Sequence, residues 1–249
     1  MSRRGTGTTM KPTAATGTTT VGGVQPGDMR VEVRHDDAHP TLAVGLGSGE
    51  SITAEAGAMM TVDDGVDVRG PEDGVGDVVD RRVSDRTPVR VVEFRAERAG
   101  EVTLAPPLPG EIVRVPVGER PVYVVQSGSF VAAQDGVKLR ATADTEHTLR
   151  GEELSFLQLV GSGAGFLAGY GGIEARSLDR GETVTADAGH VVAFARVSHE
   201  LETVEGLKSA VFDDEGVVSR FTGPGRVWLQ TRSHDAHLAW LQPQLDTLS

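Results

Sequence analysis

The sequence predicts an all-β protein in which three similar β modules are arranged with pseudo-threefold symmetry. Its composition is the first reason: valine outnumbers leucine by 34 to 18, and β-branched side chains favour the pleated surface of a sheet. An internal repeat is the second reason, because two short elements each occur three times at nearly constant spacing. Copies of one unit are expected to share one structure.

The first repeated element begins with a Gly-Glu pair and reaches a second glycine after a strand-like run. Its glutamates are Glu50, Glu119 and Glu182, and the glycines that follow the runs are Gly57, Gly128 and Gly189. We expect these glycines to supply a positive φ at a turn or bulge, and the glutamates to accept backbone N–H groups there. Residues that recur in every copy indicate geometry more than chemistry, so both sets are predicted to be structural.

The second element starts at Gly100, Gly163 and Gly225 and follows the first element in each case. Because no copy of it precedes the first Gly-Glu pair, the last strand is predicted to return and pair beside the first module. The β body then spans 29–232, with modules at about 29–92, 93–155 and 156–232. Such a closed assembly would leave no exposed sheet edge.

The individual elements follow from local patterns. Residues 1–28 hold eight Thr and six Gly with few large apolar groups, which predicts a disordered tail. Apolar and polar residues alternate from Met29, as in a half-buried strand, and again around residues 92, 113 and 227. A short helical turn is predicted at 78–83. Residues 233–249 are predicted to hold a C-terminal helix that Ser233 caps and that stops before Pro243.

Charge limits the partners of this protein. Its net charge is −12 and only three of its 24 cationic side chains are lysines, so binding to a phosphate backbone is disfavoured. An excess of carboxylate and arginine is typical of proteins from a salt-rich cytosol, and also of acidic proteins from GC-rich genomes. Both explanations stay open. The sequence contains no cysteine, which excludes disulfides and thiolate sites.

One uncharged segment is long enough to be considered as a membrane-spanning helix. Residues 154–173 form a 20-residue run without a charge, with Gly161, Gly165 and Gly169 at GxxxG spacing. Six glycines make it a poor helix, and the equivalent stretch 63 residues earlier is charged and contains prolines. We therefore predict a pair of strands and no transmembrane segment. Peripheral contact of this edge with a bilayer or an apolar partner stays open.

The remaining motifs predict neither a cofactor nor a metal site. GAGFLA at 163–168 resembles a dinucleotide fingerprint but no helix is predicted after it, and the sequence has no GxxxxGK[ST] or GxSxG motif. The histidine pairs His35/His39 and His234/His237 lack a third ligand pair and are expected to be solvated. His190 follows a repeat glycine and is expected to be a partly buried turn residue. No catalytic residue is predicted.

Four stretches resemble the altered-inheritance-of-mitochondria (mitochondrial biogenesis) family, in its branch of uncharacterised prokaryotic proteins. They are GESITAEAGAMM, FVAAQDGV, FLQLVGSGAGFLAGYGGIEARSLDRGETVTADAGHVVAF, and GLKSAVF followed by FTGPGRVWLQTR. The resemblance covers roughly residues 29–240 and implies an all-β fold of three modules, similar to the tryptophan RNA-binding attenuator protein. It implies no catalytic residues, since none is established for the family. RNA binding is not carried over, because the attenuator uses a ring of basic residues that this acidic sequence lacks.

These observations favour a non-enzymatic structural or scaffolding protein in the cytoplasm, with peripheral membrane contact and self-association as open possibilities. The alternative is a small-ligand-binding module with a pocket between two β repeats. A hydrolase that uses carboxylates or His190 is the third class, and no pair of carboxylates is singled out for it.

Overall fold

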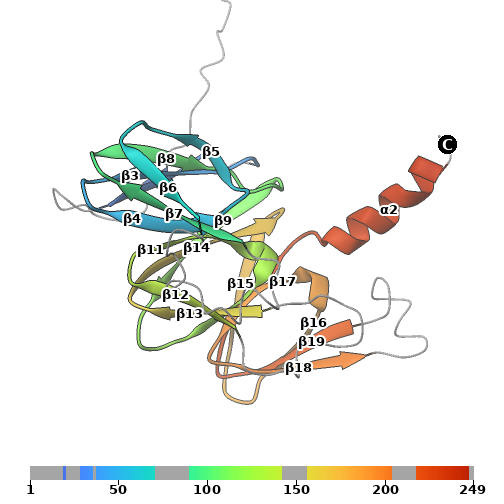
Figure 1. The fold of residues 1–249 in the computed structure, drawn as a ribbon. Coiled ribbons are helices and arrows are strands. Elements are labelled where there is room, and N and C mark those ends of the chain that lie inside the picture. Colours follow the sequence, from blue (N-terminus) through green and yellow to red (C-terminus); the bar gives the residue numbers. More distant parts are fainter. Residues whose placement is uncertain are drawn as a thin grey trace, which may run out of the picture.

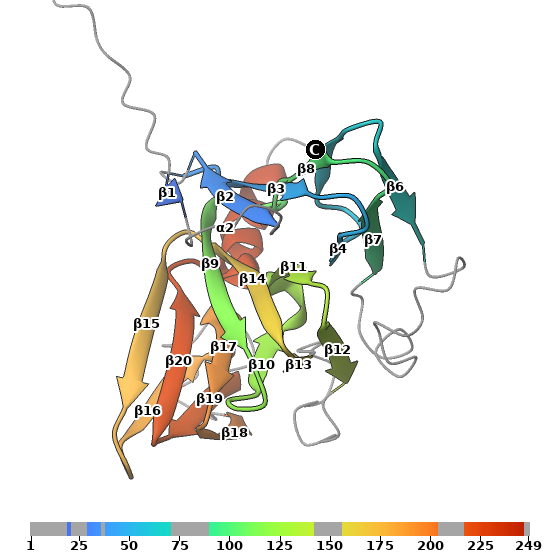
Figure 2. The same cartoon turned by 90° about the vertical axis from the view of Figure 1, so that its left-hand side faces the viewer.

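The computed structural model describes residues 19–20, 29–35, 38–70, 90–141, 156–203 and 217–246. Their strands form four sheets, named A to D here, which are stacked as successive layers (Figures 1 and 2). One α-helix, α2 (His234–Asp246), follows the last of these strands. The expected all-β fold with a short C-terminal helix is therefore confirmed.

The described part of each module contains six strands. Module 1 consists of β3 (Thr41–Leu46), β4 (Ser51–Glu55), β5 (Met59–Val62), β6 (Val66–Arg69), β7 (Val91–Ala96) and β8 (Gly100–Leu104). Module 2 consists of β9 (Gly110–Val117), β10 (Tyr123–Gln126), β11 (Phe130–Gln134), β12 (Val137–Ala141), β13 (Phe156–Gly161) and β14 (Gly163–Tyr170). Module 3 consists of β15 (Ile173–Leu178), β16 (Thr183–Asp187), β17 (Val191–Ala195), β18 (Ser198–Thr203), β19 (Val217–Thr222) and β20 (Gly225–Gln230). Strands β1 (Thr19–Thr20) and β2 (Arg30–Arg34) precede module 1.

The three modules share one pairing pattern. In each module the last strand pairs with the first and the third, which gives the orders β3-β8-β5, β9-β14-β11 and β15-β20-β17. The fifth strand pairs with the second and the fourth, which gives β4-β7-β6, β10-β13-β12 and β16-β19-β18. Each module thus contributes three strands to one sheet and three strands to the next sheet of the stack.

The two inner sheets are composite because each contains strands from two successive modules. Sheet B has the order β6-β7-β4-β11-β14-β9, in which β4 of module 1 pairs with β11 of module 2. Sheet C has the order β12-β13-β10-β17-β20-β15, in which β10 of module 2 pairs with β17 of module 3. Of the outer sheets, A (β1-β2-β3-β8-β5) combines strands of module 1 with the preceding β1 and β2, and D (β16-β19-β18) contains strands of module 3 only.

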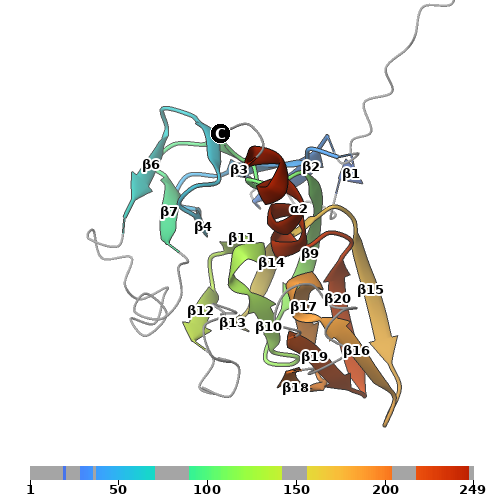
Figure 3. The ribbon, with the colours of Figure 1, turned by 90° about the vertical axis from the view of Figure 1, so that its right-hand side faces the viewer.

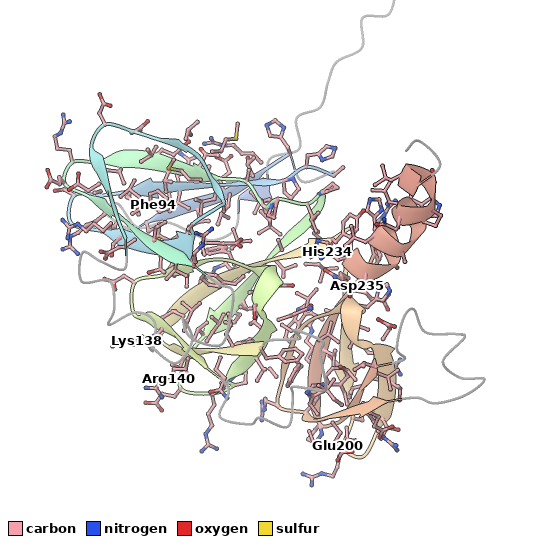
Figure 4. The ribbon with its side chains drawn as sticks, turned by 45° about the vertical axis from the view of Figure 1, so that its right-hand side comes forward. Phe94, Lys138, Arg140, Glu200, His234 and Asp235 are labelled. Carbon is pink, nitrogen blue, oxygen red and sulfur yellow. The ribbon has the colours of Figure 1, made fainter. Side chains whose placement is uncertain are left out.

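Three hydrophobic cores lie between successive sheets. Phe94 is fully buried in the core between sheets A and B, where Figure 4 shows it inside module 1. Leu159 belongs to the core between sheets B and C, and Phe221 to the core between sheets C and D. Sheets B and C therefore carry apolar side chains on both faces, which explains the glycine- and alanine-rich strand β14 between large neighbours.

The predicted ring closure is wrong. Strand β20 at the C-terminal end pairs with β15 and β17 of its own module, whereas β2 pairs with β1 and β3. The predicted module boundaries are also shifted: residue 92 lies inside β7, which pairs with β4 of module 1. The second repeated element is the last strand of each module, so no copy of it is missing at the N-terminus and no returning strand is required.

The two ends of the chain differ from expectation in detail. Thr19 and Thr20 pair with β2, so this part of the predicted tail is a strand, and the rest of 1–28 lies outside the described residues. Ser233 caps α2 through a bond from the Ala236 N–H to its Oγ at 3.4 Å. The helix runs through Pro243 instead of stopping before it. Gln244 Nε2 donates to the Trp240 carbonyl, which supplies one bond near the proline.

The charge-free run at 154–173 does form strands. Its described part holds β13 and β14, which are consecutive in sequence but belong to sheets C and B, so they do not pair with each other. Gly161 (φ +113°) and Gly163 (φ +147°) form the corner between them. Among the described residues, no helix is long and apolar enough to cross a membrane. The short helix predicted at 78–83 lies outside the described residues.

Candidate functional site

The three repeat glycines lie at the start of each module's third strand, but not in the conformation expected. Gly128 and Gly189 lie in the 3₁₀ turns η3 (Ser127–Ser129) and η5 (Ala188–His190), and neither they nor Gly57 has a positive φ. The expectation of a positive φ was wrong because the chain passes these points in a right-handed turn, which any residue adopts. Positive φ occurs instead at Gly49 (+87°) and Gly181 (+79°) of the Gly-Glu pairs.

Two of the three repeat glutamates close a turn as expected. Glu50 Oε2 accepts the Gly47 N–H at 2.6 Å, and Glu182 Oε2 accepts the Asp179 N–H at 3.0 Å. Arg176 also donates to Glu182 Oε1 at 2.9 Å. The Asp179 N–H and the Arg176 guanidinium hold the pKa of Glu182 below its usual value, because both stabilise the carboxylate. The described residues provide no such bond for Glu119.

The His190 side chain connects the turn before β17 with β20. Its Nδ1 lies 2.7 Å from the Gln230 carbonyl oxygen, and Gln230 Nε2 donates to the Gly189 carbonyl at 2.8 Å. The side-chain oxygen of Gln230 accepts the Tyr170 N–H at 2.9 Å. This network connects the turn before β17 with β20 and β14, which matches the expectation of a partly buried turn residue. Among the described residues, no group of three or more acidic or histidine side chains could hold a metal ion.

A cleft with a volume of about 860 Å³ lies between modules 2 and 3. Its walls come from the edge strands β9 and β15, from β10 and β20, and from the turn between β17 and β18, while β2 lies at its module 1 side. Figure 2 shows β9 and β15 as neighbouring edges of sheets B and C. The interleaved order of the modules places these elements together, because each composite sheet ends in the first strand of a module.

Three arginines from separate parts of the chain line this cleft. They are Arg114 on β9, Arg196 between β17 and β18, and Arg226 on β20. None of the three forms an ion pair with another residue that the structure describes. Glu111 is the acidic lining residue, and its Oε2 already accepts the Ile173 N–H at 2.7 Å. The cleft therefore has an excess of positive charge within an acidic protein.

Aromatic side chains form the inner wall. The rings of Tyr123 and Trp228 lie 5.7 Å apart, and the Arg226 guanidinium lies 5.2 Å from the centre of the Trp228 ring. Burial raises the pKa of Tyr123, and the positive charge of Arg226 opposes that shift in part. Arg196 has a positive φ of +63°, a conformation that non-glycine residues adopt at a cost and that often accompanies function.

A second cavity, of about 60 Å³, lies between the start of α2 and the turns of module 2. Glu55, Tyr170 and His234 are among its lining residues. The pKa of Glu55 is raised because burial disfavours its charged form. The His234 ring stacks on Tyr170 with the ring centres 5.7 Å apart, and His234 is nevertheless exposed, as are His35, His39 and His237, in agreement with the expectation of solvated histidines. Figure 4 shows His234 and Asp235 at the end of α2 that joins the body.

Sequence reasoning did not find the cleft residues, because they come from several strands and turns, distant in sequence, that only the fold brings together. One local signal was present: Arg226 precedes Trp228 by two positions on a predicted strand. Residues at this spacing share one face of a strand, so an arginine–aromatic pair was foreseeable there. The glycines and glutamates of the first repeated element do not line the cleft, whereas Gly225 of the second repeated element does.

Comparison with known proteins supports the fold assignment. A solved X-ray structure of a Streptococcus pyogenes protein matches 87% of this chain and 100% of its own with a TM-score of 0.74, at 23% sequence identity. An uncharacterized protein of Streptococcus pyogenes serotype M6 is 25% identical over 232 residues, covering 89% of this chain and 93% of its own length. The family model described as mitochondrial biogenesis AIM24 matches residues 31–232. The chain with this layered three-module fold therefore belongs to the mitochondrial biogenesis AIM24 family.

Proposed function

We propose that the chain is a non-enzymatic binding protein whose cleft between modules 2 and 3 takes a small anionic ligand. The observation that carries the proposal is the set of three arginines, Arg114, Arg196 and Arg226, which line one concave site without acidic partners among the described residues. Guanidinium groups bind carboxylates and phosphates through paired hydrogen bonds. The cleft volume of about 860 Å³ is within the usual range for small-molecule sites.

The rest of the lining favours a ligand that also has an apolar or planar part. Tyr123 and Trp228 offer ring faces beside Arg226, and Val31, Val33 and Ile173 extend the apolar surface. A molecule that combines an acid group with an aromatic ring would use both parts of the site.

The proposal is tested by the thermal stabilisation that matched probes produce. We expect benzoate and AMP to raise the melting temperature more than benzamide and adenosine do, because a ligand that binds only the folded state stabilises it. The triple substitution R114Q/R196Q/R226Q is expected to weaken binding of the anions at least tenfold by calorimetry, on the order of 0.5–1 kcal/mol or more per lost charge-assisted contact.

The control variant removes three positive charges at positions outside the cleft. Arg30, Arg98 and Arg140 are exposed and do not line the cleft, so R30Q/R98Q/R140Q should bind the anions as the wild type does. Equal loss in the two triple variants would indicate a general charge effect. Equal stabilisation by charged and neutral probes would also contradict the proposal.

A scaffolding function at a membrane surface is the second candidate, and helix α2 favours it. Figures 1 and 3 show α2 outside the stacked sheets. Leu238 is 59% exposed and Leu245 51%, and with the partly exposed Leu241 they recur at helical spacing. Trp240 is 63% exposed on another side of the helix. These exposed leucine and tryptophan side chains give α2 apolar surface that is available for contact with a bilayer.

Vesicle flotation tests this second candidate. We expect the wild type to float with phosphatidylcholine vesicles, which carry no net charge and do not repel an acidic protein. L238S/L245S should remain in the dense fraction. V68S/V122S removes exposed apolar side chains from β6 and the loop before β10 and should float as the wild type does. Absence of the wild type from the floating fraction would reject membrane attachment.

A further inference from the structure

Two strand pairs connect neighbouring modules, and we call them joints. Both joints have the same register relative to the repeat glycines. In sheet B, Ala54 on β4 lies opposite Ala132 on β11, and in sheet C, Val125 on β10 lies opposite Ala193 on β17. Each first residue stands three positions before a repeat glycine, Gly57 or Gly128. Each second residue stands four positions after the next repeat glycine, Gly128 or Gly189. The same pairing therefore occurs twice in the chain, at the same distances in sequence from the repeat glycines.

The two halves of a third joint lie at opposite ends of the stack. Strand β16 is the counterpart of β4 and β10, and it is an edge of sheet D, bonded to β19 alone. Strand β5 is the counterpart of β11 and β17, and it is an edge of sheet A, bonded to β8 alone. Sheets A and D are the first and last layers in every view, so β5 and β16 do not meet within one chain (Figures 1 and 2).

Strand β5 is more exposed than its counterparts β11 and β17, because among the described residues it has no neighbouring strand from another module. All three counterpart strands have a register shift at their second residue, which is Met60, Val131 or Val192. Val131 is 2% exposed and Val192 0%, because strands of neighbouring modules cover them, whereas Met60 is 61% exposed. The preceding residue follows the same rule: Met59 is 46% exposed and Phe130 1%. Module 1 thus presents apolar side chains on an edge that the other modules bury.

Neither edge carries a feature that would prevent pairing. Strand β5 reads Met-Met-Thr-Val and β16 reads Thr-Val-Thr-Ala-Asp, without lysine or proline in either strand. β-branched residues in both strands favour extended pairing.

We propose that β16 of one copy of this chain pairs antiparallel with β5 of a second copy. The register of the two internal joints places Ala186 opposite Thr61 of the next copy. Sheets D and A then combine into the order β18-β19-β16-β5-β8-β3, which is the strand order of sheets B and C. Because the two edges are different surfaces, the contact is head-to-tail and generates a ring or a filament. This inference is independent of the ligand proposed for the cleft.

Disulfide crosslinking tests the pairing and its register directly, because the chain has no cysteine of its own. We expect T61C/A186C, oxidised with copper phenanthroline, to form a ladder of multimers or a closed dimer that a reducing agent dissolves. The matched control is T61C/E200C, since Glu200 is exposed on β18, away from the free edge of β16 (Figure 4). This control is expected to lack the crosslinked species.

Sedimentation velocity of chains without cysteine gives a second measurement. The mass of the wild type is expected to rise with concentration from 26.2 kDa toward multiples of it. M60D places a charge on the exposed edge and should keep the chain monomeric with an unchanged melting temperature. V68D places the same charge at another exposed apolar position and should assemble as the wild type does.

The proposal is overturned by a wild type that stays monomeric at every concentration, or by an M60D variant that assembles as the wild type does. Crosslinking of T61C/A186C no greater than that of T61C/E200C would overturn the register and the strand pairing together.

Discussion

Replacing Gly161 with valine is expected to destabilise the protein by about 3–5 kcal/mol, since it combines backbone strain with a steric overlap. Gly161 has a φ of +113°, which L residues rarely adopt, at the corner between β13 and β14. A Cβ at this position would overlap the carbonyl oxygen of Gly136, which accepts the Ser162 N–H at 3.0 Å. The chain can relieve the overlap only by separating this corner from the turn that begins β12.

Gly57→Val is the matched control for that substitution. Gly57 has no positive φ, and a Cβ built on it meets nothing within 4 Å. We expect a change of stability within about 0.5 kcal/mol for this variant, as for an ordinary surface substitution. Urea unfolding followed by circular dichroism measures both values. Equal loss of stability in the two variants would contradict the assignment of strain to the corner.

Replacing Phe94 with alanine is expected to cost about 3–5 kcal/mol, because it empties the centre of the core between sheets A and B. Phe94 is fully buried, and its strand β7 pairs with β4, which in turn joins module 2 through sheet B. The lost volume therefore affects the layer that two modules share.

Two further variants test whether the loss of stability comes from the buried volume that is deleted at Phe94. Phe94→Leu keeps most of the apolar volume and should cost about 1–1.5 kcal/mol. Val68→Ala changes an exposed side chain on the neighbouring strand β6 and should have little effect. The same urea titration gives all three free energies of unfolding. A loss in Phe94→Leu as large as in Phe94→Ala would show that the deleted volume is not the cause.

Much of the fold was predictable because strand signals are local. Alternating apolar residues at 92, 94 and 96 and at 113, 115 and 117 predicted β7 and β9, and the spacing of Gly100, Gly163 and Gly225 predicted that β8, β14 and β20 are equivalent. The module boundaries were not predictable in the same way. A repeat in sequence has a period but no fixed starting point, so a module that begins at β3 and one that begins at β7 give the same spacing. The incorrect starting point led directly to the incorrect ring.

Local conformation and the candidate site could not be predicted from local sequence patterns, because they depend on contacts between residues that are far apart in the sequence. A glycine such as Gly57 is compatible with positive φ but does not require it, and the right-handed turn at that point needs no glycine. The cleft depends on Arg114, Arg196 and Arg226, which are separated by 82 and 30 positions and come together only when sheets B and C stack. No motif links residues at such distances, since their proximity results from packing.

The composite construction of sheets B and C has a consequence for cooperativity. Cutting the chain between β8 and β9 would leave the first fragment with half of sheet B, because β4 would lose its neighbour β11. No module can therefore complete its own sheets alone, and the loss of one removes backbone partners from the next. Heat should melt the body as one unit, with a calorimetric enthalpy equal to the van't Hoff enthalpy.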